Sequence, residues 1–264
     1  MIKVGLRSRL LICGITLIAG YSYWYAGDPV LKLIASLVFF VSAGVMVWQF
    51  VHYFGKHIVN IVKIMCMGRK AVSWVEISEF NELAKRMGVK LHRKRPFGIR
   101  KGLNNAYANC LTGQIIFGED LLQRLGSQER LALAAHELTH LKQNHWVRMF
   151  QLLLIVGLIV TLSLSLTSGP AIVSNLTCAA AQMITFVFVS WWNEFAADKG
   201  AGLQAGQAAT ISLLQGIVPA SQWRRETETH PSITGRVSRL QKMQPLDQPL
   251  LPAPYETEMV KLRY

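Results

Sequence analysis

Residues 127–145 read Ser-Gln-Glu-Arg-Leu-Ala-Leu-Ala-Ala-His-Glu-Leu-Thr-His-Leu-Lys-Gln-Asn-His, with His136-Glu137-Leu138-Thr139-His140 at their centre. We expect one helix here that begins near Gln128, with Ser127 as its N-cap. Two histidines four positions apart project from the same face of a helix, so both imidazoles can bind one metal ion. Glu137 lies beside them and is placed to take a proton from metal-bound water. The pattern predicts a helix whose two histidines bind a zinc ion.

A catalytic zinc ion needs a third protein ligand as well as an open position for water. His145 is close in sequence, but the metzincin pattern requires glycine and histidine where this chain has Gln143 and Trp146. Glu194 is the better candidate, because the run Glu194-Phe195-Ala196-Ala197-Asp198 puts two carboxylates on one helical face. Asp198 could then orient a ligand histidine.

Helix lengths support the choice of Glu194. No charged residue occurs between Arg148 and Glu194, and Gly169-Pro170 divides this stretch in two. If both halves are helical and antiparallel, the first covers about 44 Å from His140 and the second returns about 36 Å. The second helix then brings Glu194 to within about two turns of the histidines, and either tilt of the helices or a helix break near His145 would absorb the difference.

The apolar composition of the chain predicts membrane spans. The 264 residues are 51% hydrophobic and 16% charged, with a mean hydropathy of +0.28, which is too apolar for an ordinary soluble domain. About 20 apolar residues cross the hydrocarbon core of a bilayer. Four stretches meet that length approximately, at residues 10–26, 33–51, 149–167 and 171–192.

The basic residues predict the orientation of these spans. The formal net charge is +13, and the Lys and Arg side chains collect at the N-terminus, in residues 52–148 and after Glu194. The positive-inside rule therefore puts both termini and the active site in the cytoplasm. Basic residues that flank apolar runs suit anionic lipid headgroups, so we expect membrane lipids as partners and no nucleic acid.

The polar segment between the second and third apolar stretches reads as mixed α/β. Residues 79–87 have helical periodicity and stop at Gly88, and a strand-like piece follows at 89–91. Residues 105–117, with a turn at Thr112-Gly113, predict a β-hairpin. The chain then divides into a transmembrane hairpin, a catalytic segment with the histidines, a second transmembrane hairpin, and a catalytic segment with Glu194 and the tail. The predicted boundaries are 1–54, 55–148, 149–192 and 193–264.

In this order, the motifs resemble those of the HtpX-like membrane metallopeptidases, which belong to the gluzincin family that also contains the CAAX prenyl endopeptidases. The similar segments are His136 to His145, the two apolar spans, Glu194 to Asp198, Asn105-Ala106-Tyr107-Ala108, and Thr229-His230-Pro231 followed by Arg236 and Leu240. The chain departs from the family at Trp191-Trp192-Asn193 and after Leu240. The resemblance and the apolar runs together predict a mainly α membrane protein. It would have four transmembrane helices and a cytoplasmic α+β zincin-like catalytic domain with a small β-hairpin or sheet.

The resemblance also implies roles for individual residues. One zinc ion per chain would be held by His136, His140 and Glu194, with Glu137 as the general base and Asp198 orienting a ligand. The strand formed by Asn105, Ala106, Tyr107 and Ala108 would accept an extended substrate as an added strand. We hypothesise that His230 stabilises the oxyanion of the transition state.

The predicted function is a zinc-dependent endopeptidase of the bacterial inner membrane that hydrolyses protein or peptide substrates with metal-activated water. The resemblance suggests membrane or misfolded proteins as substrates, in quality control. A catalytically silent zinc-binding sensor or scaffold is the first alternative, and the intact Glu137 speaks against it. A site-2-type intramembrane protease is the second, but charged side chains surround the motif, namely Glu129, Arg130, Lys142 and Arg148. A basic membrane-surface or nucleic-acid binder leaves the histidines and glutamate unexplained.

Overall fold

A computed structural model describes residues 6–45, 72–165, 171–227 and 229–243. The chain forms two compact units, which we call the helical unit and the α+β unit. The helical unit comprises residues 1–69, 147–191 and 226–229, and the α+β unit comprises residues 70–146, 192–225 and 230–264.

Long apolar helices make up the helical unit. They are α1 (Leu6–Tyr25), a helix at 29–45, most of α6 (His145–Ser165) and the first part of α7 (Ala171–Ala205). Asp28 caps the helix at 29–45, because its Oδ1 accepts hydrogen bonds from the backbone N–H groups of Val30 (2.8 Å) and Leu31 (3.0 Å). Pro29 occupies the first helical position, where no N–H is needed.

The predicted spans coincide with these helices wherever the structure describes them. The stretch predicted at 171–192 lies in α7, and the stretch predicted at 10–26 lies in α1 except for residue 26. Residues 46–51 and 166–167 of the other two lie outside the described residues. Within the described parts of the chain, no helix combines the length and the apolar character that crossing a membrane requires. The four spans are therefore not confirmed and stay a prediction.

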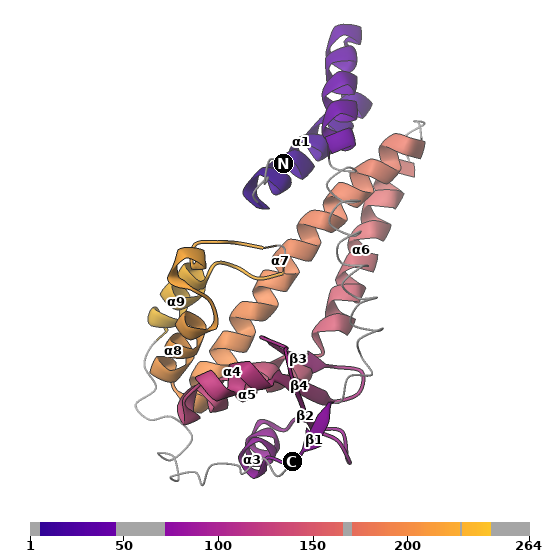
Figure 1. Ribbon diagram of the computed structural model, residues 1–264. Helices are drawn as coiled ribbons and strands as arrows, with labels where there is room; N and C mark the ends of the chain where they lie inside the picture. Colours follow the sequence, from indigo (N-terminus) through magenta and orange to yellow (C-terminus); the bar gives the residue numbers. More distant parts are fainter. Residues whose placement is uncertain (1–5, 46–71, 166–170, 228, 244–264) are drawn as a thin grey trace. The chain divides into compact units, whose positions relative to one another are not determined.

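The α+β unit is mainly helical with a small mixed sheet, which is consistent with a zincin-like domain. Its elements, besides the end of α7, are β1 (Ser73–Val75), α3 (Ser78–Met87), β2 (Phe97–Arg100), β3 (Ala106–Asn109), β4 (Gln114–Gly118), α4 (Glu119–Arg124), α5 (Ser127–Gln143), α8 (Gln207–Ile217), η1 (Ala220–Gln222) and α9 (Ile233–Gln241). Figure 1 shows α3 and α5 beside the sheet.

The sheet has the strand order β1-β2-β4-β3. β4 pairs in parallel with β2 and antiparallel with β3, so β3 is an edge strand. The hairpin predicted at 105–117 is confirmed as β3 and β4, with Gly113 at a positive φ of 69° in its turn. The strand expected at 89–91 is wrong: these residues form a loop, although the His92 N–H bonds the Gly113 carbonyl at 2.8 Å.

Aromatic rings fill the core between α3 and the sheet. Phe80 of α3 packs against Phe97 of β2 and Phe117 of β4, with ring centroids 5.6 and 5.4 Å away. The middle of α5 is buried in the same core, and α5 also contacts β3 and α8. Burial of its apolar side chains on several sides fixes the position of the helix that carries the histidines.

The ends of α5 differ slightly from expectation. Ser127 is the first helical residue rather than the cap, and Gly126 is the N-cap, with its N–H donating to the Glu129 carboxylate at 2.8 Å. Asn144 follows the last residue of α5 with a φ of 46°, in the left-handed region that ends helices. This break near His145 is one of the two ways in which we expect the length difference to be absorbed, and α6 begins at His145.

Candidate metal centre

Two helices bring the three predicted metal ligands together. α5 carries His136 and His140, whose Nε2 atoms lie 3.1 Å apart, and α7 carries Glu194. The Glu194 carboxylate oxygens lie 3.7 Å from His136 Nε2 and 3.5 Å from His140 Nε2. One potential ligand atom from each residue thus falls within 4.8 Å of the other two. The four-residue spacing of the histidines on α5 and the position of Glu194 on α7 therefore bring the three residues together, as the sequence predicts.

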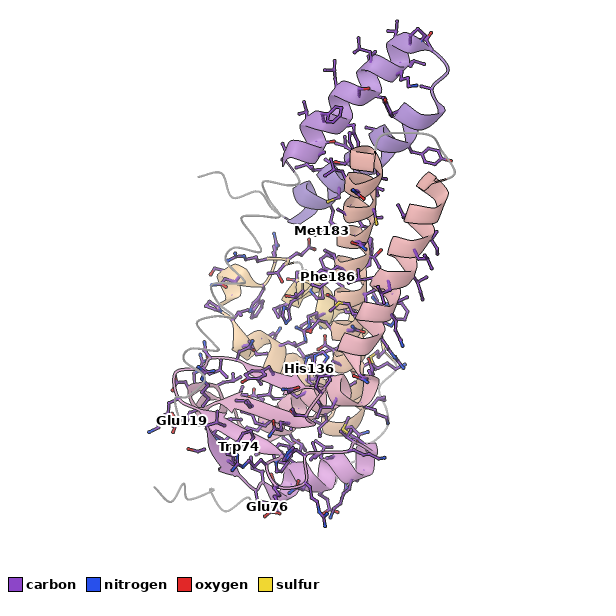
Figure 2. The ribbon with its side chains drawn as sticks, turned by 90° about the vertical axis from the view of Figure 1, so that its right-hand side faces the viewer. Trp74, Glu76, Glu119, His136, Met183 and Phe186 are labelled. Atoms are coloured by element: carbon purple, nitrogen blue, oxygen red, sulfur yellow. The ribbon has the colours of Figure 1, made fainter. Side chains whose placement is uncertain are left out.

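Asp198 orients the first histidine. Its Oδ1 lies 3.1 Å from His136 Nδ1, one helical turn beyond Glu194 on α7. Burial lowers the pKa of His136, but the hydrogen bond to Asp198 and the charge on Glu194 outweigh that effect and raise it. A proton held at Nδ1 by Asp198 would leave Nε2, which lies near His140 and Glu194, free to bind a metal ion. Figure 2 labels His136 in the α+β unit.

Arg236 is a member of the site whose role the sequence motifs did not predict. Its Nε and Nη2 donate to the two carboxylate oxygens of Asp198 at 2.7 and 2.6 Å, and its Nη1 lies 3.1 Å from Glu194 Oε2. The side chain is buried on α9 among Ile233, Val237 and Leu240. A signal was present in the sequence, since an arginine on the apolar face of a helix requires a buried anionic partner.

The guanidinium sets the charge state of both acids. Burial alone raises the pKa of Glu194, but the Arg236 charge, with help from His140 and His230, holds it well below its usual value. The pKa of Asp198 is lowered in the same way, with burial opposed by Arg236 and His136. Arg236 itself has a raised pKa, because the two carboxylates outweigh its burial. Both acids are therefore anionic at neutral pH.

The model of peptidase family M48 matches residues 70–244, which is more than half of the chain and contains every residue of this site. The chain belongs to peptidase family M48. No curated protein matches it. Membership makes this M48 protein a metallopeptidase by family, and the His/His/Glu cluster is where its metal would bind.

The chemistry of the cluster fits a zinc ion. Two imidazole nitrogens and one carboxylate form a donor set that zinc prefers, and the two Nε2 atoms and the carboxylate lie close enough together to bind one ion. Glu194 Oε2 is buried and accepts no hydrogen bond of good geometry from the described residues. Arg236 Nη1, 3.1 Å away, gives this oxygen one cationic neighbour, and a bound metal ion would supply the coordination that no hydrogen bond provides.

Glu137 and His230 also lie at the centre. Glu137 is buried on α5 between the two histidines in sequence, and its charge helps to raise the pKa of Arg236. His230 Nε2 lies 3.7 Å from Glu194 Oε1, and its side chain is 54% exposed. Its pKa is lowered, because loss of hydration and nearby positive charge outweigh the Glu194 carboxylate. A neutral, accessible imidazole is thus available beside the ligands.

The edge strand β3 lies beside the same helix. It contacts α5, and Cys110, next after its last residue, places its Sγ 3.5 Å from the His140 carbonyl oxygen. Of the predicted substrate strand, Asn105 precedes β3, and Ala106, Tyr107 and Ala108 belong to it. His145 begins α6, but its side chain lies outside the described residues.

Close packing of α7 on α5 holds the two halves of this M48 site together, and a Gly200→Ala change tests it. A Cβ at Gly200 would overlap the buried Thr139 side chain, whose Oγ1 is fixed by donating to the Ala135 carbonyl at 2.8 Å. We expect a loss of about 1–3 kcal/mol in the free energy of unfolding, measured as a fall in the melting temperature.

Gly202→Ala on the same helix is the matched control. Its Cβ would meet only Leu240 Cδ2, at an ordinary 3.5 Å, so helix propensity makes the change neutral or stabilising. Thr139→Ala combined with Gly200→Ala should restore most of the loss. A Gly200→Ala protein as stable as Gly202→Ala would show that the helices are not in close contact here.

Proposed function

We propose that the chain is a zinc-dependent endopeptidase that cleaves peptide bonds with a water molecule activated at His136, His140 and Glu194. The observation that carries the proposal is the convergence of these three ligand atoms, with Asp198 and Arg236 fixing the first and third of them. Zinc, rather than another divalent ion, is favoured by the two imidazole ligands and by the small ligand number.

Each side chain at the centre would have a separate role in the reaction. Bound zinc supplies Lewis acidity, which polarises a carbonyl and lowers the pKa of water toward neutrality. The Glu137 carboxylate takes the proton of the attacking water and returns it to the departing amine. His230 would donate a hydrogen bond from its ring to the developing oxyanion, a role that its exposure and its 3.7 Å distance from Glu194 support. Asp198 keeps a proton on His136 Nδ1 throughout.

Substrate would bind as an additional strand on β3. In the described residues β3 pairs with a neighbouring strand only through β4, so its other edge can offer backbone N–H and C=O groups to an extended peptide. Recognition through backbone groups would give a broad sequence preference. This supports protein and peptide substrates, including the membrane or misfolded proteins expected of an HtpX-like quality-control peptidase.

We also propose that the helical unit is embedded in a bilayer, in the predicted four spans, with the α+β unit in the cytoplasm. Support comes from apolar side chains that its helices leave at least 60% exposed, among them Leu11, Ile18, Val41, Leu158 and Phe188. Exposed apolar surface of this kind marks protein or membrane contacts. The basic termini and the charge-free tip between α6 and α7 favour the cytoplasmic orientation.

Removal and return of the metal tests the function. The protein is purified from the membrane fraction in detergent under chelation, and casein cleavage is then measured as zinc is added. We expect no cleavage without metal and full cleavage with about one zinc ion per chain, because three ligands define one site. Manganese and magnesium should restore much less, since they prefer oxygen ligands.

Each outcome has a clear meaning. Zinc bound at one equivalent without any cleavage would favour the sensor or scaffold alternative. Cleavage that persists in chelator would contradict a metallopeptidase. Recovery of the chain from the soluble fraction rather than the membranes would contradict the proposed bilayer embedding and leave the zinc chemistry untouched.

A further inference from the structure

A basic stretch of the α+β unit has no role in the zinc site. Between Glu82 and Glu119 the sequence contains no acidic residue. The same stretch contains eight basic residues, Lys85, Arg86, Lys90, Arg93, Lys94, Arg95, Arg100 and Lys101. Lys85 and Arg86 lie one turn after the acidic Glu82 on α3, but the loop after α3 has no acidic residue close to it in the sequence.

The loop cations are exposed and uncompensated. Lys90, Arg93 and Lys94 are exposed, and among the residues that the structure describes none of the three forms an ion pair with a carboxylate. Arg95 is exposed too, with its guanidinium 6.0 Å from the centroid of the Trp74 ring. A cluster of like charges costs free energy in isolation, so the surface is built to meet an anionic partner.

The turn between β3 and β4 lies against this loop. The His92 N–H bonds the Gly113 carbonyl at 2.8 Å, and a Cβ on Gly113 would come 3.1 Å from the Lys90 carbonyl oxygen and the His92 nitrogen. The loop is fixed in turn by His92, whose Nδ1 accepts from the Arg95 N–H at 3.1 Å. Loop and turn therefore form one preorganised surface.

Leu111 lies at the tip of that turn. Its side chain is 85% exposed, the highest value among the exposed large hydrophobic residues that the structure describes. The Leu111 N–H bonds Asn109 Oδ1 at 3.1 Å, which holds the tip in a tight turn. Hairpin turns favour polar residues, so a leucine held in water by an ordered backbone indicates a contact with something apolar.

We propose that this surface, made of Lys90, Arg93, Lys94, Arg95 and Leu111, docks the α+β unit on a bilayer that contains anionic lipids. The leucine would enter the headgroup region while the four cations meet lipid phosphates, each strengthening binding on the order of fivefold. A nucleic acid would satisfy the cations but gives the aliphatic tip no partner, and an acidic protein is distinguished by the test below. The proposal rests on the membrane location proposed above and adds a contact outside the predicted spans.

Hydrogen exchange of the full-length chain in lipid nanodiscs tests the proposal. Discs of pure phosphatidylcholine are compared with discs that contain phosphatidylglycerol, and exchange is followed in peptides covering residues 90–95 and 109–113. We expect exchange in both peptides to slow at least threefold in the anionic discs alone. The double change Arg93→Glu/Lys94→Glu should abolish the difference, and Leu111→Ser should reduce it.

The matched control is Arg224→Glu/Arg225→Glu, an adjacent exposed pair elsewhere on the α+β unit. It should keep the full difference between discs. Equal exchange in the two lipids would overturn the proposal. The proposal would also be overturned if the control pair abolished the difference between discs equally, or if protection appeared only when polyglutamate or RNA was added.

Failure of this proposal is separable from failure of the proposed function. Casein cleavage measured in the same discs reports on the zinc chemistry, and Arg93→Glu/Lys94→Glu should leave it within about twofold. If the chain did not enter discs at all, flotation with anionic against neutral vesicles would replace exchange. Flotation with anionic vesicles alone would then be expected, and its absence would overturn the docking surface.

Discussion

A Glu137→Gln change is expected to lower casein cleavage by about 10²–10⁴-fold while leaving zinc binding at one equivalent. Glutamine has the shape of glutamate but cannot accept the proton of the attacking water, so the general-base contribution is lost. Glu137 is not one of the three proposed ligands, so zinc binding is kept. The glutamine fills the buried position of Glu137 on α5 equally well. Cleavage rates on labelled casein and zinc content by elemental analysis measure the two effects separately.

The comparison that sharpens this prediction is His230→Ala, which removes the ring N–H donor without supplying another. If His230 donates to the oxyanion, its replacement should reduce kcat by about 10²–10³-fold with little change in KM. The two variants should therefore both keep zinc and both lose turnover. Glu137→Gln with more than a tenth of native activity would mean that another group takes the proton. Unchanged turnover in His230→Ala would leave His230 as a surface residue beside Glu194.

The ligand set could be predicted because it depends on local helical geometry. Two histidines at a four-residue spacing must share a helical face, and two helices of similar length joined at Gly169-Pro170 must return Glu194 toward them. In the structure Glu194 lies beside the two histidines, and α5 ends at a break at Asn144, which is one of the two ways that we expected the length difference to be absorbed. The hairpin at β3 and β4 was predictable for the same reason, since its turn residues lie within it.

Other parts depend on contacts between distant residues and could not be predicted. β1 and β2 are only three and four residues long, and their pairing is decided by strands elsewhere in the chain. The partnership of Arg236 with Asp198 joins residues 38 positions apart. Helical periodicity indicates that Arg236 is buried, but it does not indicate which carboxylates the guanidinium contacts.

Arg236→Met is expected to be the most destabilising single change at the site. It removes the guanidinium that contacts both Asp198 and Glu194, and it leaves both buried carboxylates without the positive charge that lowers their pKa values. Loss of one partner from a buried ion pair costs about 3–5 kcal/mol. In metal-free protein the melting temperature should therefore fall on the order of 10 °C, measured by differential scanning fluorimetry in detergent with chelator present.

Arg239→Met on the same helix is the matched control. Its exposed guanidinium lies 4.4 Å from the centroid of the Phe195 ring, a contact worth about 1 kcal/mol or less. If Arg239→Met lowered the melting temperature as much as Arg236→Met, the loss would come from α9 itself and not from the buried charges.

The change in melting temperature on adding zinc is a second measurement on Arg236→Met. If the ion binds Glu194 as proposed, it supplies positive charge beside one of the two carboxylates that lose the Arg236 guanidinium in Arg236→Met. Adding zinc should therefore raise the melting temperature of Arg236→Met more than that of the native chain. The double variant Arg236→Met/Asp198→Asn should show a smaller difference from the native chain in this zinc-induced rise, because the second change removes the negative charge of Asp198. An equal response to zinc in the native and Arg236→Met proteins would indicate that Arg236 stabilises α9 and not the charge of the metal ligands.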